Sequence, residues 1–223
     1  MCFSATASFA ASGVLTGLGA AAIVRNTSKP HRLFAAIPLL FAAQQAAEGT
    51  VWLTMHTDPN AALHRLAVNV FLACALVVWP SWLPNSLRLA ERDPTRRRVL
   101  AALSVFGALV SATALSLLVR EQPIVHIAGH SLRYDYTGSG NASLHLLYLV
   151  GYVIPTVVPL FVSTSYLSRT IGTLLVVSLG LTALTERDTL TSVWCFFAAL
   201  LSGLIWVAVE RARRVGAGYL TAT

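Results

Sequence analysis

Long apolar segments separated by short charged connections restrict this chain to folds that exist in a lipid bilayer. The apolar runs approach about 20 residues, the length that an α-helix needs to cross the hydrocarbon layer. They show no alternation with a period of two, so transmembrane β-strands do not fit. Charged residues make up only 11% of the chain, against about 25% in ordinary soluble domains, and the mean hydropathy is +0.68. We therefore expect an all-α integral membrane bundle, with residues 1–223 forming a single transmembrane domain.

The sequence predicts about seven transmembrane helices. They cover Ser4–Val24, Leu33–Met55, His64–Leu83, Val99–Val119, Ser143–Val162, Thr170–Leu184 and Leu190–Val209. The connection from Arg120 to Ala142 is the longest, and its GSGN stretch at 138–141 marks a turn. Within it, Gly129 and the alternating LRYDY that follows argue against a regular helix.

Basic residues gather on one side of the predicted membrane. Of the 16 Lys and Arg residues, 12 share that side: Arg25, Lys29, Arg32, Arg88, Arg92, Arg96, Arg97, Arg98, Arg169, Arg211, Arg213 and Arg214. Because such connections stay in the cytoplasm, we expect the N-terminus outside and the C-terminus inside, in the plasma (inner) membrane. The net charge of +7 then comes from basic residues that contact the cytoplasmic leaflet, and it implies no nucleic-acid partner.

Glu48 is the residue that fits a membrane helix least. It lies seven residues before the outer end of its segment, or about 10 Å deep at 1.5 Å per residue. A carboxylate at that depth costs roughly 2.5 kcal/mol or more unless it is paired, protonated or bound to a cation. Gln44 and Trp52 lie one turn before and after it on the same face. We interpret Glu48 as a functional acid or metal ligand, and a purely structural hydrogen-bonding role is the alternative.

Two cysteines are predicted to reach the same outer layer. Cys195 lies about 7 Å below the outer end of the last segment, and Cys2 lies just before the first. They fit three descriptions: metal ligands, a disulfide on an oxidising face, or two free buried thiols. Cys74 falls near mid-membrane and is interpreted as a small core residue.

Histidine and tyrosine side chains are also predicted on the outer side. His145, Tyr148 and Tyr152 recur at spacings of three and four, which places them on one helical stripe. We expect this stripe to line a cavity, the alternative being an interfacial aromatic anchor. His126 and His130 lie in the long outer connection.

Thiolate, imidazole and carboxylate donors together suit zinc. We expect a zinc site formed by Cys2, Cys195, His130 and Glu48, in which His126 or His145 is the substitute for His130. Removal of the initiator methionine would make Cys2 the first residue, so that its amine and thiolate chelate one ion. Serine and alanine at four-residue spacings in the first and last segments allow those helices to approach closely.

The chain resembles a family of small, functionally uncharacterised bacterial membrane proteins that begin MCFSATASF. The resemblance covers nearly the whole chain and includes PLLFAAQQAAEG, the WP pair at Trp79–Pro80, GHSLRY and SVWCFFAALLS. It transfers no activity, but it implies importance for the family's recurring polar residues, which here are Cys2, Ser4, Gln44, Glu48, His130, Tyr134, Trp194 and Cys195. The predicted cavity is therefore lined by Gln44, Trp52, Tyr134, Tyr148, Tyr152 and Trp194.

Three classes of function fit these features. The first is a zinc-dependent membrane hydrolase or hydratase that acts on a lipid or small molecule from the outer face, with Glu48 as the general base. The second is a transporter or channel for a metal ion or proton, although the cytoplasmic half offers almost no polar path. The third is a structural or sensory module held by a Cys2–Cys195 disulfide.

Overall fold

The computed structural model describes residues 4–25, 29–55, 61–121, 123–135, 142–185, 189–207 and 209–210. The described elements, in chain order, are α1 (Ala5–Arg25), the short 3-10 turn η1 (Lys29–His31), α2 (Arg32–Ala35), α3 (Ile37–Thr54), α4 (Ala62–Leu72), the π-helical η2 (Ala73–Val78), α5 (Trp79–Ala90), α6 (Pro94–Arg120), the strands β1 (Ile124–Ala128) and β2 (Ser131–Asp135), α7 (Ala142–Val162), α8 (Tyr166–Thr185) and α9 (Leu190–Ser202).

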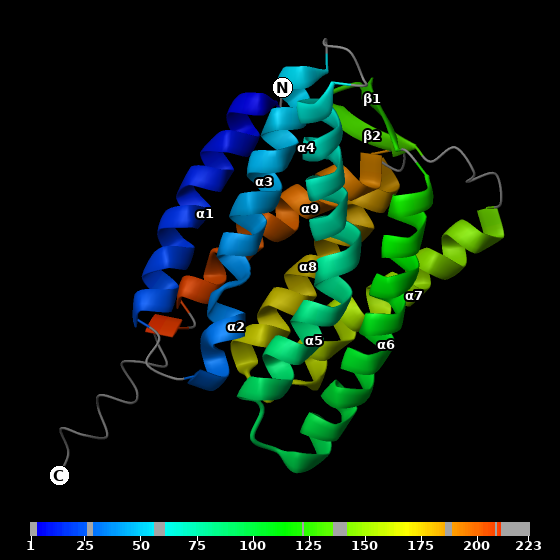
Figure 1. Cartoon of the computed structure of the whole chain (residues 1–223). Helices are drawn as coiled ribbons and strands as arrows, with labels where there is room; N and C mark the ends of the chain where they lie inside the picture. The colour runs from blue at the N-terminus through cyan, green and yellow to red at the C-terminus, as the bar shows by residue number, and fades with distance from the viewer. Residues whose placement is uncertain are drawn as a thin grey trace.

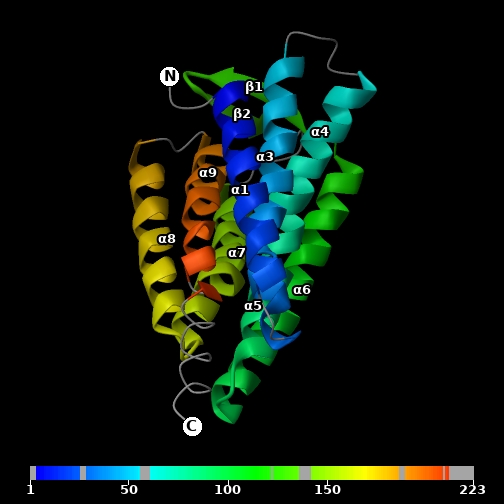
Figure 2. The same cartoon turned by 90° about the vertical axis from the view of Figure 1, so that its left-hand side faces the viewer.

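The helices form a bundle, which confirms the predicted helical architecture (Figures 1 and 2). α1 packs against α3, α5 packs against α6 and α7, and α8 packs against α7 and α9. α9 also contacts α1 and α3, while α2 contacts α1 and α5. These contacts close a ring of α1, α2, α5, α7, α8 and α9 around the interior of the bundle.

Five helical stretches among the described residues are long and apolar enough to cross a membrane. They are Ala5–Arg25, Ala62–Ala90, Pro94–Arg120, Leu167–Leu184 and Leu190–Val207. The described apolar part of α7, Tyr148–Val162, is shorter, and α3 is not among the five. The membrane character of the chain is thus supported, whereas the count of seven crossings and their direction stay predictions.

Two helices extend further than predicted at their charged ends. The third predicted segment continues to Ala90 instead of ending at Leu83, and the fourth begins at Pro94 instead of Val99. Asp93 explains the early start of α6, because its side chain accepts a hydrogen bond from the Arg96 backbone N–H at 2.7 Å. Such N-caps stabilise helix starts irrespective of apolar content, so hydropathy alone places the boundary too late.

A β-hairpin between α6 and α7 is the main addition to the predicted helical fold. Its antiparallel strands pair Ile124 with Asp135 and Ala128 with Ser131, which leaves a two-residue turn at Gly129 and His130. Gly129 has a φ of 61°, in the left-handed region that glycine adopts most easily. Leu132 is fully buried with Phe71, and the Tyr134 ring stacks on Phe71 at 4.9 Å. The hairpin therefore covers one end of the bundle, where α3 ends and α4 begins (Figure 1).

The π-helical turn η2 lies directly before Trp79 and Pro80. Proline has no N–H, so carbonyls in the preceding turn lose their regular helical partner. Side chains of neighbouring helices satisfy carbonyls there: Ser111 of α6 donates to Val77 O at 2.6 Å, and Tyr152 of α7 donates to Ala75 O at 2.6 Å. The irregular turn is thus fixed from two sides, and it determines where the Trp79 side chain lies.

The opposite end of the bundle carries most of the described basic residues and a buried carboxylate. Glu91, in the connection between α5 and α6, accepts hydrogen bonds from the backbone N–H groups of Arg92 and Asp93 and from both the N–H and the hydroxyl of Thr164. Burial alone would raise the pKa of Glu91, but these hydrogen bonds outweigh it and hold the pKa below the usual value. Glu91 therefore joins the α5–α6 connection to the α7–α8 connection. His31 is a separate case: burial and the nearby charge of Arg92 lower its pKa.

Candidate functional site

Glu48 is the centre of a buried polar cluster between α3 and α9. Its Oε1 accepts a hydrogen bond from the Ser192 hydroxyl, and its Oε2 accepts one from Gln45 Nε2 at 3.1 Å. Glu48 is only 2% exposed and Ser192 only 1%, which confirms that this carboxyl group is buried. In the described part of the chain no basic side chain forms an ion pair with it. Two neutral donors therefore hold a group that a membrane interior would otherwise penalise strongly.

Gln44 connects this cluster to the aromatic residues of α5. Its side-chain carbonyl accepts a hydrogen bond from Trp79 Nε1 at 2.8 Å, and the Trp79 ring stacks on Phe41 with ring centroids 4.1 Å apart. Gln44 is fully buried and also interacts with the thiol of Cys195. Its Nε2 group has no hydrogen-bond partner that meets normal geometry among the described residues. Gln44 therefore links Trp79 of α5 to Cys195 of α9.

Aromatic residues of α7 and α9 complete the cluster. Tyr152 is buried, and its ring lies edge-on to Trp194 with centroids 6.0 Å apart. Tyr148 lies one turn before Tyr152, with ring centroids 6.3 Å apart, as the predicted helical stripe requires. Cys195 lies near both Glu48 and Tyr152. The site thus combines a carboxyl group, a thiol and a phenol from three different helices.

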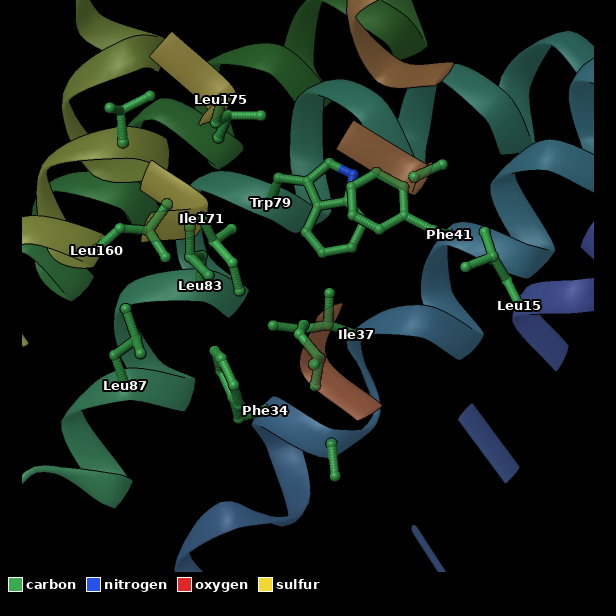
Figure 3. Close-up of a cluster of buried hydrophobic side chains, with 14 of the residues drawn as sticks. Leu15, Phe34, Ile37, Phe41, Trp79, Leu83, Leu87, Leu160, Ile171 and Leu175 are labelled. Atoms are coloured by element: carbon green, nitrogen blue, oxygen red, sulfur yellow. The ribbon is translucent and has the colours of Figure 1, made fainter. Parts of the chain in front are cut away.

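An apolar cavity of about 70 Å³ begins at this cluster and extends toward the arginine-rich end. Trp79, Tyr152, Trp194 and Cys195 line it where it meets the cluster, and the rest of its described lining is Phe34, Ile37, Phe41, Leu83, Thr156, Leu160, Ile171, Leu175, Ala198, Leu201, Ser202 and Ile205. Figure 3 shows part of this lining: Leu160 and Ile171 lie on the left of the drawn cluster, and Ile37 and Phe41 lie farther to the right. Apolar pockets with a few polar groups nearby are the usual form of small-molecule sites, although most of those sites are larger than this cavity.

The structure brings together several of the residues predicted from sequence. Gln44, Glu48, Tyr152, Trp194 and Cys195 lie in one buried region, and Tyr148 packs against its edge. Tyr152, Trp194 and Cys195 line the cavity directly. Trp52 and Tyr134 instead pack on the neighbouring apolar cluster under the hairpin, together with Phe71 and Leu132.

The predicted histidine ligands lie elsewhere or outside the described residues. His126 is exposed on β1, and His130 is exposed in the hairpin turn, whereas Glu48 and Cys195 are buried. Cys2 lies outside the described residues, as does the side chain of His145. Among the described residues no group of three or more His, Cys, Asp or Glu side chains is placed to hold a metal ion. Cys195 is a free cysteine in the same part of the chain, so zinc binding and a Cys2–Cys195 disulfide stay predictions.

Sequence reasoning did not identify three partners in this region. Ser192 and Gln45 hold the carboxylate, and Trp79 binds Gln44. Gln45 had a usable signal, because it lies three residues before Glu48 and therefore on the same helical face. Ser192 and Trp79 had no such signal. They lie on other helices, and one sequence does not show which helices are neighbours. Cys74, interpreted as a small core residue, is half-buried.

Comparison with known proteins gives a family but no activity. The model of a family of unknown function (DUF6629) matches residues 1–219. No curated protein and no solved structure matches the chain. The function must therefore be argued from the arrangement of these residues.

Proposed function

The chain belongs to this family of unknown function, and we propose that it is a membrane-embedded enzyme that uses Glu48 to transfer protons during hydrolysis or hydration of a lipid or small molecule. The observation that supports this most is the position of Glu48. A buried carboxyl group, held by Ser192 and Gln45, lies beside Cys195, which lines an apolar cavity. Ionisable groups inside membrane proteins are rare and usually functional.

Glu48 would act as general base and then as general acid. As a carboxylate it takes a proton from an attacking water molecule, and the same proton passes to the leaving group of the substrate. Ser192 and Gln45 fix the two carboxylate oxygens, so the free lone pairs keep one orientation toward the reacting atoms. Restricting a catalytic group in this way is a common source of rate enhancement.

Zinc is the cofactor that we propose for this site, with Cys195, Cys2, Glu48 and His130 as candidate ligands. A thiolate and a carboxylate are donors that zinc accepts, and bound zinc would lower the pKa of a coordinated water molecule. The proximity of Cys195 and Glu48 supports a shared site for these two. His130 would have to approach from its exposed position in the hairpin turn, with His126 and His145 as substitutes.

We propose that the hairpin end of the bundle faces the extracytoplasmic side of the plasma membrane. The described basic residues at the opposite end support this orientation: Arg25, Lys29, Arg32, Arg88, Arg92, Arg96, Arg97, Arg98 and Arg169. A reporter fused after Arg214 should show a cytoplasmic location, and one inserted at residues 136–141 should show an external location. The reverse pattern would place the site on the cytoplasmic side and refute the orientation.

Turnover of membrane lipids tests the proposed enzyme most simply. Purified wild-type protein and the Glu48→Gln variant would be incubated with a total lipid extract, and lipid species would be compared by mass spectrometry. Wild-type protein should consume a discrete lipid class and Glu48→Gln should not, because glutamine keeps the shape but cannot carry the proton. Glu121→Gln, at the end of α6, is the matched control and should retain turnover. Equal turnover by wild type and Glu48→Gln would refute the role of Glu48.

Metal analysis tests the zinc proposal separately. We expect about one zinc per purified wild-type chain and loss of it in Cys195→Ser. Cys74→Ser, which alters the other described free cysteine, should keep its zinc. Extending the N-terminus by a few residues should also reduce the zinc content if Cys2 chelates through its amine. Wild-type protein without bound zinc after purification in zinc-containing buffer would exclude this cofactor.

A further inference from the structure

The described lining of the cavity offers almost no polar surface to an occupant, and it contains no charged side chain. Each hydroxyl and indole donor in this lining is already bound inside the protein. The pairs are Tyr152 with Ala75 O, Thr156 with Tyr152 O, Ser202 with Ala199 O, Trp79 with Gln44 Oε1 and Trp194 with Leu175 O. A charged or strongly polar ligand group would therefore be buried here without compensation, which is unfavourable.

The cavity has room for a small group only. Its volume of about 70 Å³ is about half that of the apolar cavity of about 150 Å³ that binds benzene or xenon. Cavities lined in this way stay dry, so an occupant does not have to displace ordered water. The size and the lining together favour an uncharged group of a few carbon atoms.

Trp79 belongs to both the cavity and the buried polar cluster. Its ring lines the cavity and stacks on Phe41, another lining residue, with ring centroids 4.1 Å apart. Figure 3 shows these two rings side by side. On its other side the Trp79 Nε1–H donates to Gln44 Oε1 at 2.8 Å. A group that fills the cavity therefore lies next to a side chain that holds Gln44.

Trp79 determines which way the Gln44 amide faces. An indole N–H can only donate, so the Gln44 carbonyl must be directed toward Trp79. The amide N–H groups are then left for Cys195, whose thiol is hydrogen-bonded to Gln44. That second hydrogen bond lies outside normal geometry, so a small movement of the amide strengthens or breaks it. The position of Trp79 is thus transmitted to Cys195 through one fully buried side chain.

We propose that the cavity binds a small uncharged hydrocarbon group by apolar contacts alone, and that Trp79 and Gln44 transmit its presence to Cys195. The occupant restricts the Trp79 ring to the position in which its N–H reaches Gln44, and this holds the amide against the thiol. A ligand shifts such an equilibrium only through contacts that differ between the two states, and contact with the ring supplies that difference. The inference rests on the proposed function only in making this group a part of the substrate.

Stabilisation by propane tests binding to the cavity. A ligand that binds only the folded protein raises its unfolding midpoint, and variants would be compared in the same micelles. Ala198 lines the cavity, whereas Leu200 is exposed on the same helix. Propane should stabilise wild type and Leu200→Phe but not Ala198→Phe. Ala198→Leu adds less bulk at the same position and should respond less than wild type. Equal stabilisation of wild type, Leu200→Phe and both Ala198 variants would overturn the site.

Ethanol tests whether the contacts are apolar alone. It has as many heavy atoms as propane, but its hydroxyl group would be buried without a free partner in the described lining. It should therefore bind at least about tenfold more weakly than propane. Similar affinities for the two ligands would show that a polar partner is available and would overturn the proposed chemistry of the ligand.

Infrared spectroscopy of the Cys195 thiol tests the transmission. Its S–H stretching band responds to hydrogen bonding and is identified by its loss in Cys195→Ser. In Gln44→Leu the band should move to the position of an unbonded thiol, and propane should move the wild-type band in the opposite direction. Propane should not move the band in Gln44→Leu or Trp79→Phe. Trp194→Phe is the matched control, because this indole also lines the cavity but donates to Leu175 O, so the response should remain.

The outcomes separate this inference from the proposed enzyme. A propane response that persists in Gln44→Leu and Trp79→Phe would show direct action on Cys195 and overturn the transmission. Propane binding without any movement of the wild-type band would overturn it as well. Binding and a transmitted response in a protein that turns over no lipid would support the cavity site and refute the enzyme. Lipid turnover by a protein that propane does not stabilise would do the reverse.

Discussion

Gly107 on α6 is expected to be the position where a single methyl group disturbs the fold most. A Cβ atom there would lie 1.8 Å from Pro80 O and 2.6 Å from Pro80 C, both in the backbone of α5. Normal contacts between heavy atoms are about 3.5 Å, so α6 would have to move away from α5 by more than about 1 Å. Pro80 follows Trp79 directly, so the same movement would displace the residue that binds Gln44.

The expected loss of stability in Gly107→Ala is about 1–4 kcal/mol. Overpacking against an immobile backbone costs about 1–3 kcal/mol. The hydrogen bond from Ser111 to Val77 O, one turn along α6, would weaken as the helices separate, which adds about 1 kcal/mol. The better helix propensity of alanine offsets up to about 1 kcal/mol of this loss of stability.

Unfolding of the purified protein in mixed micelles, followed by circular dichroism, measures this difference. Gly17→Ala on α1 is the matched control, because no neighbouring atom lies within 4 Å of its added Cβ. It should be neutral or more stable by up to about 1 kcal/mol. If Gly107→Ala and Gly17→Ala have the same stability, α5 and α6 do not approach this closely, and the placement of Trp79 argued above is wrong.

Two further predictions concern hydrogen bonds between helices. Glu91→Gln should lower stability by about 1–3 kcal/mol at neutral pH, because the carboxylate accepts its hydrogen bonds as an anion. The folded pKa of Glu91 is depressed, so this stabilisation is present above the unfolded value of about 4.3 and is lost as the pH falls through the folded value. The stability difference between wild type and Glu91→Gln should therefore shrink at acid pH, and a constant difference would contradict the mechanism. Tyr152→Phe should cost about 1–2 kcal/mol by removing the donor to Ala75 O, whereas Thr113→Val, which removes an exposed hydroxyl, should cost less.

Helix geometry was a sufficient basis for predicting that several of the main polar residues lie near one another, whereas their depth in the membrane stays a prediction. Glu48 and Cys195 are buried and interact, and Tyr148 and Tyr152 follow one stripe, because positions along and around a single helix follow from its geometry. The partners from other helices could not be found in this way. Ser192 and Trp79 reach the site through tertiary packing, which leaves no trace in the spacing of one sequence.

The long outer connection was described only as non-helical. Its antiparallel pairing depends on a turn at Gly129 and on burial of Leu132 under the end of the bundle, and only the first of these is a local feature. The cavity was expected from the tyrosine stripe, but most of its described lining consists of aliphatic residues that resemble ordinary core positions. Aliphatic core and aliphatic cavity look alike in a sequence, because the difference between them is the packing of neighbouring helices.

Infrared difference spectroscopy of Glu48 tests the central claim most directly. A proton-transferring group must be able to change its protonation state in the folded protein, whereas a purely structural hydrogen-bonding group need not. Spectra of wild type and Glu48→Gln would be compared across a pH titration, with the carbonyl stretch of a protonated carboxyl group as the signal. The Cys195 thiol, which lies close to Glu48, absorbs at another frequency. We predict a carboxyl band that titrates reversibly in wild type and is absent from Glu48→Gln. Identical spectra for the two proteins at every pH would show that Glu48 does not exchange a proton, and would contradict its proposed role.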